Sequence, residues 1–253
     1  MAVRGGQLEG SLRSIVDKAK SAARVENRGE EEAPRRTLRK QREKEQRINT
    51  ILGAAEELFA SKGYQGTNIE EIADLAEVST GTIYFYFKNK EDLLIRLMHN
   101  IGFLIRKTLG EGLAESGFSL EDFCVVGTRF VREFCLRYPG KAVILFRESA
   151  GQSDEVEEHR KLLFNTITND IKGGLEEVVR RQGGRFKSAN ASELIATLVV
   201  GIYNQLAYHY LIWQDQTDIA LDIADETASF LLAGASSLLA PGRKAGRTGK
   251  ADK

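Results

Sequence analysis

The stretch that decides the fold is TNIEEIADLAEVSTGTIYFYFKNKED, residues 67–92. Thr67, with Glu70 three residues later, predicts a capping box and therefore a helix that begins there. Ser79 is a good N-cap for a second helix that runs to about Phe87. The stretch therefore predicts two short helices joined by a tight turn.

The second helix is too short and too aromatic to be an ordinary core helix. Ile83 and Phe87 lie four residues apart, so they share one face and anchor the helix inward. The side chains on its other faces remain available to a partner, and the major groove of DNA is the expected one. These side chains are Thr80, Thr82, Tyr84, Phe85 and Tyr86.

Helices are also predicted on both sides of this pair. Between about residues 38 and 62, apolar side chains recur at spacings of three and four residues. This pattern predicts an amphipathic helix that ends at Gly63. Asn89 caps a third helix, and Lys90 lies in its first turn. A cation beside the free N–H groups of a helix start indicates a phosphate site. Together the helices predict a three-helix DNA-reading module.

Four motifs at fixed spacing make residues 44–104 resemble the tetracycline-repressor-type (TetR) family of bacterial regulators. They are ILGAAEELF at 51–59, GY at 63–64, the stretch 67–87, and KEDLL at 90–94. The resemblance implies an obligate homodimer with an N-terminal helix-turn-helix domain and a C-terminal helical domain that binds a small molecule. Glu77 departs from the family, which often has Gly there, and a left-handed backbone would cost Glu more than Gly.

The resemblance also assigns the DNA contacts. Thr80 and Thr82 are expected near bases or neighbouring phosphates, while Tyr84, Tyr86 and Lys90 are expected on phosphates. The complete set of expected DNA-binding residues is Thr67, Asn68, Ser79, Thr80, Thr82, Tyr84, Phe85, Tyr86 and Lys90, with Arg39 and Lys40 before the module.

The net charge of zero conceals two oppositely charged halves. Residues 33–107 have 13 basic and 10 acidic side chains, whereas residues 108–240 have 12 basic and 19 acidic ones. A basic run over 33–50 leads directly into the module. Such a run is ordinarily a solvated helix face, but its position favours contact with phosphates. The acidic second half would repel DNA and keep the protein oriented on it.

Scarce proline and the lack of alternating β-branched residues predict an all-α fold, with an N-terminal helix-turn-helix domain and a C-terminal helical bundle. The expected segments are an extension at 1–36, a DNA-binding domain at 37–104 with its helix-turn-helix at about 68–87, a ligand-binding and dimerisation domain at 105–240, and a disordered basic tail at 241–253. Helices are expected at about 90–110, 119–137, 141–150, 153–181, 189–213 and 217–239.

The last expected helix is rich in small residues, which let helices approach closely. They are Ala220, Ala224, Ala228, Ala233, Gly234 and Ala235. Packing within one chain explains such a row, and the resemblance implies an alternative: a four-helix interface between two copies. A dimer also has a physical reason, because one module reads only a half-site.

Aromatic side chains recur along the expected regulatory helices. They are Phe123, Phe130, Phe134, Phe146, Phe164, Tyr203, His209 and Trp213. Aromatic stripes at helical spacing ordinarily belong to a core, but the family has an apolar cavity among these helices. Apolar walls with a few polar groups suit a hydrophobic or amphipathic effector, such as an acyl chain or an aromatic drug.

Other chemistry is not indicated. The three histidines are far apart in the sequence and have no partner at metal-ligand spacing, so no metal or cofactor is expected. Cys124 and Cys135 would lie about 16 Å apart along one helix, too far for a disulfide. No secretory leader or long apolar run is apparent, which favours a cytoplasmic protein without a membrane partner. No nucleophile elbow or phosphate loop is present, so an enzyme is not expected.

The sequence therefore predicts a transcriptional regulator, by family default a repressor, that binds operator DNA and is released by a small ligand. A helical ligand-binding or scaffolding protein without DNA binding is the alternative.

Overall fold

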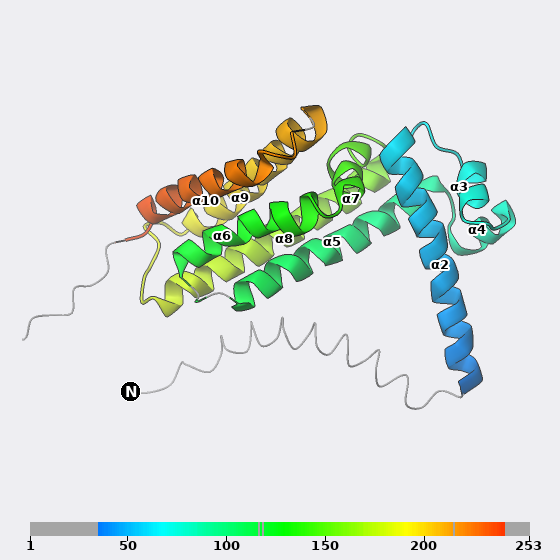
Figure 1. Ribbon diagram of the computed structural model, residues 1–253. Coiled ribbons are helices and arrows are strands. Elements are labelled where there is room, and N and C mark those ends of the chain that lie inside the picture. The colour runs from blue at the N-terminus through cyan, green and yellow to red at the C-terminus, as the bar shows by residue number, and fades with distance from the viewer. Residues whose placement is uncertain (1–34, 116, 118, 215, 241–253) are drawn as a thin grey trace, which may run out of the picture. The chain divides into compact units, whose positions relative to one another are not determined.

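The computed structural model describes residues 35–115, 117, 119–214 and 216–240. Within them the chain forms helices joined by turns and loops, with one isolated bridge between Phe186 and Leu239 (Figure 1). The expected all-α class is confirmed. The predictions for residues 1–34 and for the tail from 241 onward lie outside the described residues. Contacts divide the chain into residues up to Thr50 and residues from Ile51 onward. The domain boundary expected near residue 104 falls inside one continuous helix and stays a prediction.

The residues of the predicted DNA-reading module lie in α2 (Arg35–Lys62), α3 (Ile69–Leu75), α4 (Thr80–Tyr86) and the start of α5 (Lys90–Glu115). Its core consists of apolar side chains that are almost completely buried, among them Phe59, Ile72, Ile83 and Leu93. Gly63, with a φ of +82°, follows the end of α2 as expected. Asn89 caps α5, because its side chain accepts the N–H of Asp92 at 2.9 Å.

The capping box predicted for α3 is wrong by one residue. Asn68 is the N-cap: its Oδ1 accepts the N–H of Glu71 at 2.8 Å, and the Glu71 carboxylate accepts the N–H of Asn68 at 3.1 Å. The side chain of Thr67 instead turns inward, where its hydroxyl donates to the carbonyl of Gly63 at 2.9 Å. Thr67 therefore fixes the loop before α3 rather than the helix itself.

The turn between α3 and α4 has the geometry of a Schellman motif. The N–H of Val78 donates to the carbonyl of Ala73 at 2.9 Å, and the N–H of Glu77 donates to Asp74 at 3.1 Å. Glu77 has a φ of +53°, the left-handed conformation expected for this position. Ser79 then caps α4, since its hydroxyl accepts the N–H of Thr82 at 3.1 Å.

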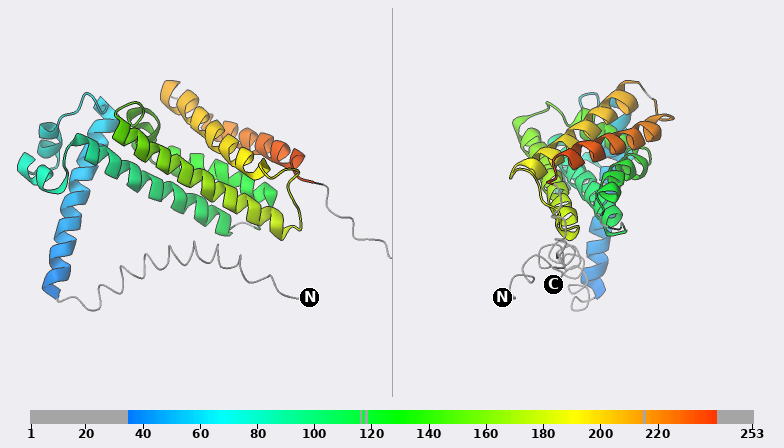
Figure 2. Two further views of the ribbon diagram at one scale, coloured as in Figure 1. Left: turned by 180° about the vertical axis from the view of Figure 1, so that it is seen from behind. Right: turned by 90° about the vertical axis from the view of Figure 1, so that its left-hand side faces the viewer.

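The remaining helices form a bundle. They are α6 (Leu120–Phe130), η1 (Val131–Cys135), α7 (Pro139–Val143), η2 (Ile144–Glu148), α8 (Asp154–Arg181), α9 (Ala191–Leu206), η3 (Ala207–Trp213) and α10 (Ala220–Ser237). The helix α5 packs against α6 and α8, while α9 lies on α8 and α10 lies on α6 (Figures 1 and 2). Ser119 with Asp122 forms a capping box at the start of α6.

Three of the expected helices contain π-helical segments, η1, η2 and η3. The residue that follows a segment donates its N–H to the carbonyl five residues earlier, as from Leu136 to Val131 at 2.9 Å and from Ser149 to Ile144 at 2.9 Å. Such segments are rare and often mark functional sites. All three lie in the bundle, and η3 contacts both η1 and η2.

The small residues of α10 divide between two faces. Ala220, Ala224 and Ala228 are buried within the chain, and the carbonyl of Ala224 accepts the hydroxyl of Thr128 in α6 at 3.4 Å. On the opposite side Phe230 is 68% exposed and Gly234 has open space around it. Packing within the chain therefore explains the first row and leaves the second without a partner among the described residues.

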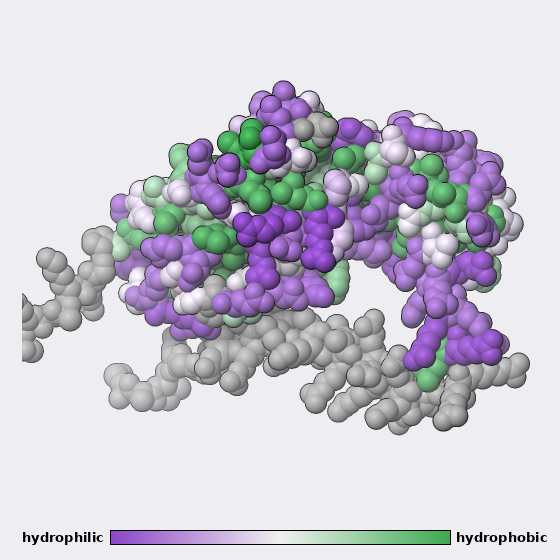
Figure 3. All heavy atoms as spheres, viewed as in Figure 1, coloured by the Kyte–Doolittle hydropathy of each residue, from purple (hydrophilic) through white to green (hydrophobic). Residues whose placement is uncertain are grey.

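Apolar side chains are also exposed on α9, where Leu194 and Leu198 are about half exposed, at 50% and 49%. Hydrophobic side chains reach the surface along the part of the bundle where α10 lies (Figure 3). By length and composition alone, the helix over Ala191–Trp213 is apolar enough to cross a membrane. Only 22% of its most apolar window is buried within the described residues. These helices expose apolar side chains that a partner surface could cover.

Candidate nucleic-acid interface and regulatory core

The short helix α4 is anchored on one face and open on the others. Ile83 is completely buried, whereas Tyr84 is 56% and Phe85 is 78% exposed. The rings of Phe85 and Tyr86 meet in a T-shaped arrangement at a centroid distance of 4.9 Å. Exposing large aromatic rings on a helix that has an available core is unfavourable in water, so these side chains are suited to contact a partner.

Polar residues at the start of α4 are held in place before any partner binds. The hydroxyls of Ser79 and Thr82 lie 2.9 Å apart, and both side chains reach the surface with Thr80. At the start of α3, Asn68 is exposed although its side chain caps the helix. Thr67 is only 2% exposed, so the structure does not present its side chain to DNA, because the hydroxyl is used inside the loop.

Lys90 is a structural cation as well as a candidate phosphate contact. Its Nζ donates to the carbonyls of Tyr64 and Thr67, each at 2.8 Å, and lies 4.3 Å from the centre of the Tyr64 ring. Burial lowers the pKa of Lys90 and raises that of Tyr64 to about 12. The ammonium group has three donor protons, so one is left for an outside anion.

The basic run is described from residue 35 onward. Arg39 and Lys40 lie on α2 and are exposed, and the Arg39 Nε donates to the Glu43 carboxylate at 2.8 Å. An exposed pair of this kind contributes little to stability. Arg39 can therefore exchange its partner for a phosphate at small cost.

The predicted effector residues separate into a core, a cavity lining and a surface group. Phe134 and Phe146 are almost completely buried, and Phe130 stacks on Phe134 with centroids 5.3 Å apart. Phe164 is half-buried beneath the guanidinium of Arg160. His209 and Trp213 are exposed, Trp213 by 62%, with ring centroids 6.4 Å apart.

A small cavity of about 20 Å³ lies among α6, α8, α9 and α10. Two of the expected effector residues, Phe123 and Tyr203, line this cavity. The sequence analysis did not indicate the other residues that line it. Tyr203 is 5% exposed, and its hydroxyl lies near Thr128 but makes no hydrogen bond of good geometry among the described residues. Burial raises the pKa of this phenol. An unsatisfied buried hydroxyl is costly, which favours a polar guest such as water or part of a ligand.

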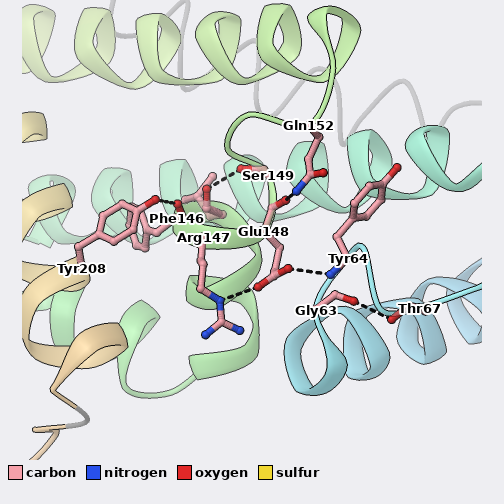
Figure 4. A network of polar contacts seen from close by, with 10 residues as sticks. Gly63, Tyr64, Thr67, Phe146, Arg147, Glu148, Ser149, Gln152 and Tyr208 are labelled. Carbon is pink, nitrogen blue, oxygen red and sulfur yellow. Dashed lines mark hydrogen bonds and ion pairs between the residues drawn. The ribbon is translucent and has the colours of Figure 1, made fainter.

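Sequence reasoning missed a polar network between the bundle and the DNA-reading module, shown in Figure 4. Glu148 of η2 accepts the backbone N–H of Tyr64 at 2.7 Å and the Arg147 Nε at 2.5 Å. The hydroxyl of Tyr208 in η3 donates to the carbonyl of Phe146. No local pattern could reveal Glu148, because its partner Tyr64 is 84 residues away in the chain.

The titratable groups outside this network do not form a metal cluster within the described ranges. Two histidines that are far apart in the sequence nevertheless meet in the fold: His99 of α5 and His159 of α8 have ring nitrogens 3.3 Å apart. Burial and the neighbouring His159 and Arg96 lower the pKa of His99. Cys124 and Cys135 are free and buried.

Comparison with known proteins agrees with this arrangement. The family model for bacterial regulatory proteins of the tetR family matches residues 51–97. An uncharacterised helix-turn-helix regulator of Bacillus subtilis, YdeS, is 30% identical over 170 residues, which cover 66% of this chain and 80% of the relative. The fatty acid metabolism regulator protein of the same organism is 24% identical over 196 residues, 76% of this chain and 97% of the relative.

Among solved structures, the FadR regulator of Bacillus subtilis in complex with stearoyl-CoA superposes with a TM-score of 0.64 at 23% identity, covering 73% of this chain and 97% of that one. These sequence relatives are transcriptional regulators, and this chain has a helix-turn-helix followed by a helical bundle, so it is a transcriptional regulator of the same class. The chain belongs to the tetR family of bacterial transcriptional regulators.

Proposed function

We propose that the protein is a cytoplasmic, homodimeric repressor that binds operator DNA through α3 and α4, without enzymatic activity of its own. The observation that carries this proposal is α4 itself. Tyr84 and Phe85 are exposed on a helix whose opposite side, through Ile83, is completely buried. A rigid helix that presents unpaired side chains is the arrangement by which helix-turn-helix proteins enter the major groove.

We infer that two copies associate through the exposed apolar face of α9 and α10. Leu194 and Leu198 lie four residues apart and therefore on one face, and Phe230 adds a large ring from α10. A scaffolding protein without DNA binding would also use such a face, but it would have no use for the exposed aromatics of α4. The exposed aromatic side chains of α4 therefore favour a DNA-binding regulator over a scaffolding protein.

We infer further that the effector is an amphipathic molecule with an acyl chain, such as an acyl-CoA. Two observations support this class: the aromatic core around Phe130, and the unpaired Tyr203 hydroxyl at the cavity. The likeness to a fatty acid metabolism regulator favours the same class. A cavity of about 20 Å³ has room for about one water molecule, so an acyl chain must displace core side chains as it enters.

Fluorescence polarisation with labelled DNA from the region upstream of the protein's own gene tests the function. We expect salt-dependent binding that competitor DNA of random sequence does not remove. Stearoyl-CoA should then weaken operator binding by about 5–150-fold, the usual range for coupled sites, while coenzyme A alone should not. Failure to bind this DNA and any selected sequence would contradict the DNA-binding function, whereas binding without a response to stearoyl-CoA would contradict only the effector class.

A further inference from the structure

One carboxylate connects the regulatory bundle to the loop that precedes α3. Glu148, the last residue of η2, is 9% exposed. Its Oε2 accepts the backbone N–H of Tyr64 at 2.7 Å, and its Oε1 accepts the Arg147 Nε at 2.5 Å (Figure 4). The same Oε2 lies against Gly63, where an added Cβ would approach it to 3.2 Å. The Glu148 carboxylate therefore packs against both Gly63 and the Tyr64 backbone of this loop.

The loop held by Glu148 supports both helices that follow it. The carbonyls of Tyr64 and Thr67 accept the ammonium of Lys90, the first residue of α5, at 2.8 Å each. Asn68, which follows Thr67 in the chain, is the N-cap of α3. A displacement of the Tyr64 backbone therefore moves the start of α3 and the start of α5 together.

The other end of the connection lies in the aromatic core. Phe146 is two residues before Glu148 in the same π-helical segment, and its ring meets that of Phe130 edge-on at a centroid distance of 6.5 Å. The carbonyl of Phe146 accepts the hydroxyl of Tyr208 in η3. A rearrangement of these rings that turns η2 must therefore redirect the Glu148 carboxylate.

Two further polar contacts join the same regions, and they are less suited to this role. Gln65 donates to Gln152 at 2.5 Å on the exposed surface, and Lys141 pairs with Glu56. Contacts between side chains at or near the surface contribute little and can be replaced by water. Glu148 differs because it satisfies a backbone N–H of a residue that is 5% exposed, and such a group is costly to leave unpaired.

We propose that Glu148 is the positioning residue through which the aromatic core controls the DNA-reading helices. The part of this inference that concerns the effector rests on the proposed function. The part that concerns the loop does not, because Glu148 holds the Tyr64 backbone whether or not DNA is bound. The two parts can therefore be tested separately.

The test compares the full-length wild-type protein with Glu148→Ala, Glu148→Gln and a matched control, Glu133→Ala. Glu133 is a carboxylate in the neighbouring segment η1 that pairs at the surface with Arg137 at 3.4 Å. Hydrogen exchange of the peptide containing residues 63–67 reports on the loop, thermal unfolding reports on the fold, and fluorescence polarisation reports on operator binding. Gln keeps an oxygen that can accept the Tyr64 N–H but has no charge.

We expect Glu148→Ala to raise exchange of the Tyr64 amide about tenfold or more and to weaken operator binding about tenfold. Glu148→Gln should stay within about threefold of wild type, and Glu133→Ala should change neither quantity. Wild-type exchange in Glu148→Ala would overturn the positioning role. Faster exchange with unchanged operator affinity would overturn the coupling to DNA. If the wild-type protein binds no operator, the proposed function fails, while the exchange result still decides the role of Glu148 in the loop.

Discussion

Glu77 is the residue at which the sequence and the backbone are in conflict. Among the described residues it is the one non-glycine position with a positive φ, +53°. The conformation is imposed by the Schellman motif that turns the chain from α3 into α4, because the N–H of Val78 must reach the carbonyl of Ala73. A residue with a Cβ is strained there, by about 1 kcal/mol or more.

Replacing Glu77 with Gly should therefore stabilise the protein by about 1 kcal/mol, after part of the relief is offset by the greater freedom of Gly in the unfolded chain. The expected rise in Tm is about 2–4 °C at fixed protein concentration, measured by circular dichroism. Glu57→Gly is the control, because Glu57 is an exposed residue inside α2 and Gly should lower stability there. A fall in Tm for Glu77→Gly would show that the side chain contributes more than the strain costs.

The cysteines allow a second prediction at this scale. Burial raises the pKa of the Cys124 thiol to about 11 and that of Cys135 still further above its ordinary value. At pH 8 only about one Cys124 thiol in a thousand is then ionised, and the thiolate is the reactive form. Neither thiol should react with Ellman's reagent in the native protein, and both should react in guanidinium chloride. Fast reaction of the native protein would contradict the burial of these residues.

Single residues also show where sequence reasoning reached its limit. Ser79 and Asn89 were recognisable as caps because each binds a backbone group three residues away. Thr67 and Asn68 are both good caps, and the choice between them was decided by a carbonyl, that of Gly63, which a local pattern does not include. Lys90 was expected to face an anion, but its position also brings it within reach of two loop carbonyls.

At the scale of elements, α4 has the clearest functional consequence. Phe85→Ala removes a side chain that is 78% exposed, so thermal stability should change by no more than about 0.5 kcal/mol. Operator affinity should fall by about tenfold, equivalent to about 1.4 kcal/mol, if the ring contacts DNA. Phe103→Ala is the matched control, because Phe103 lies on α5 and is 70% exposed. Equal operator affinities for the two variants would remove Phe85 from the interface.

Most elements were predictable because their ends are fixed by local capping, as with Ser153 at the start of α8. The π-helical segments were not predictable. A helix with one turn of i→i−5 bonding shows nearly the same apolar spacing as an uninterrupted α-helix, and packing of the bundle decides where the extra residue is accommodated. The aromatic residues of the core were found by their spacing, but their division between core, cavity and surface depends on the tertiary structure.

At the scale of the whole molecule, the exposed apolar side chains of α9 and α10 bear on the oligomeric state of the protein. Phe230→Arg introduces a charge on the face proposed for dimerisation, and it should convert the proposed dimer to monomers in sedimentation velocity experiments. Operator affinity should then fall sharply, because one module reads a half-site. Leu162→Arg is the control, since Leu162 is 62% exposed on α8. A dimeric Phe230→Arg variant would show that another surface holds the two copies together.

The three π-helical segments limit how the regulatory bundle can change shape. The N–H of Ser149, which follows η2, bonds to the carbonyl five residues earlier, that of Ile144. In an ordinary α-helix it would bond to the carbonyl four residues earlier, and no stable arrangement lies between these two hydrogen-bonding patterns. In a helix with 3.6 residues per turn, a shift of one residue turns the following side chain by about 100°. Movement of Glu148 would therefore occur in discrete steps rather than as a gradual drift. Each step would correspond to a shift of the backbone hydrogen bonding by one residue.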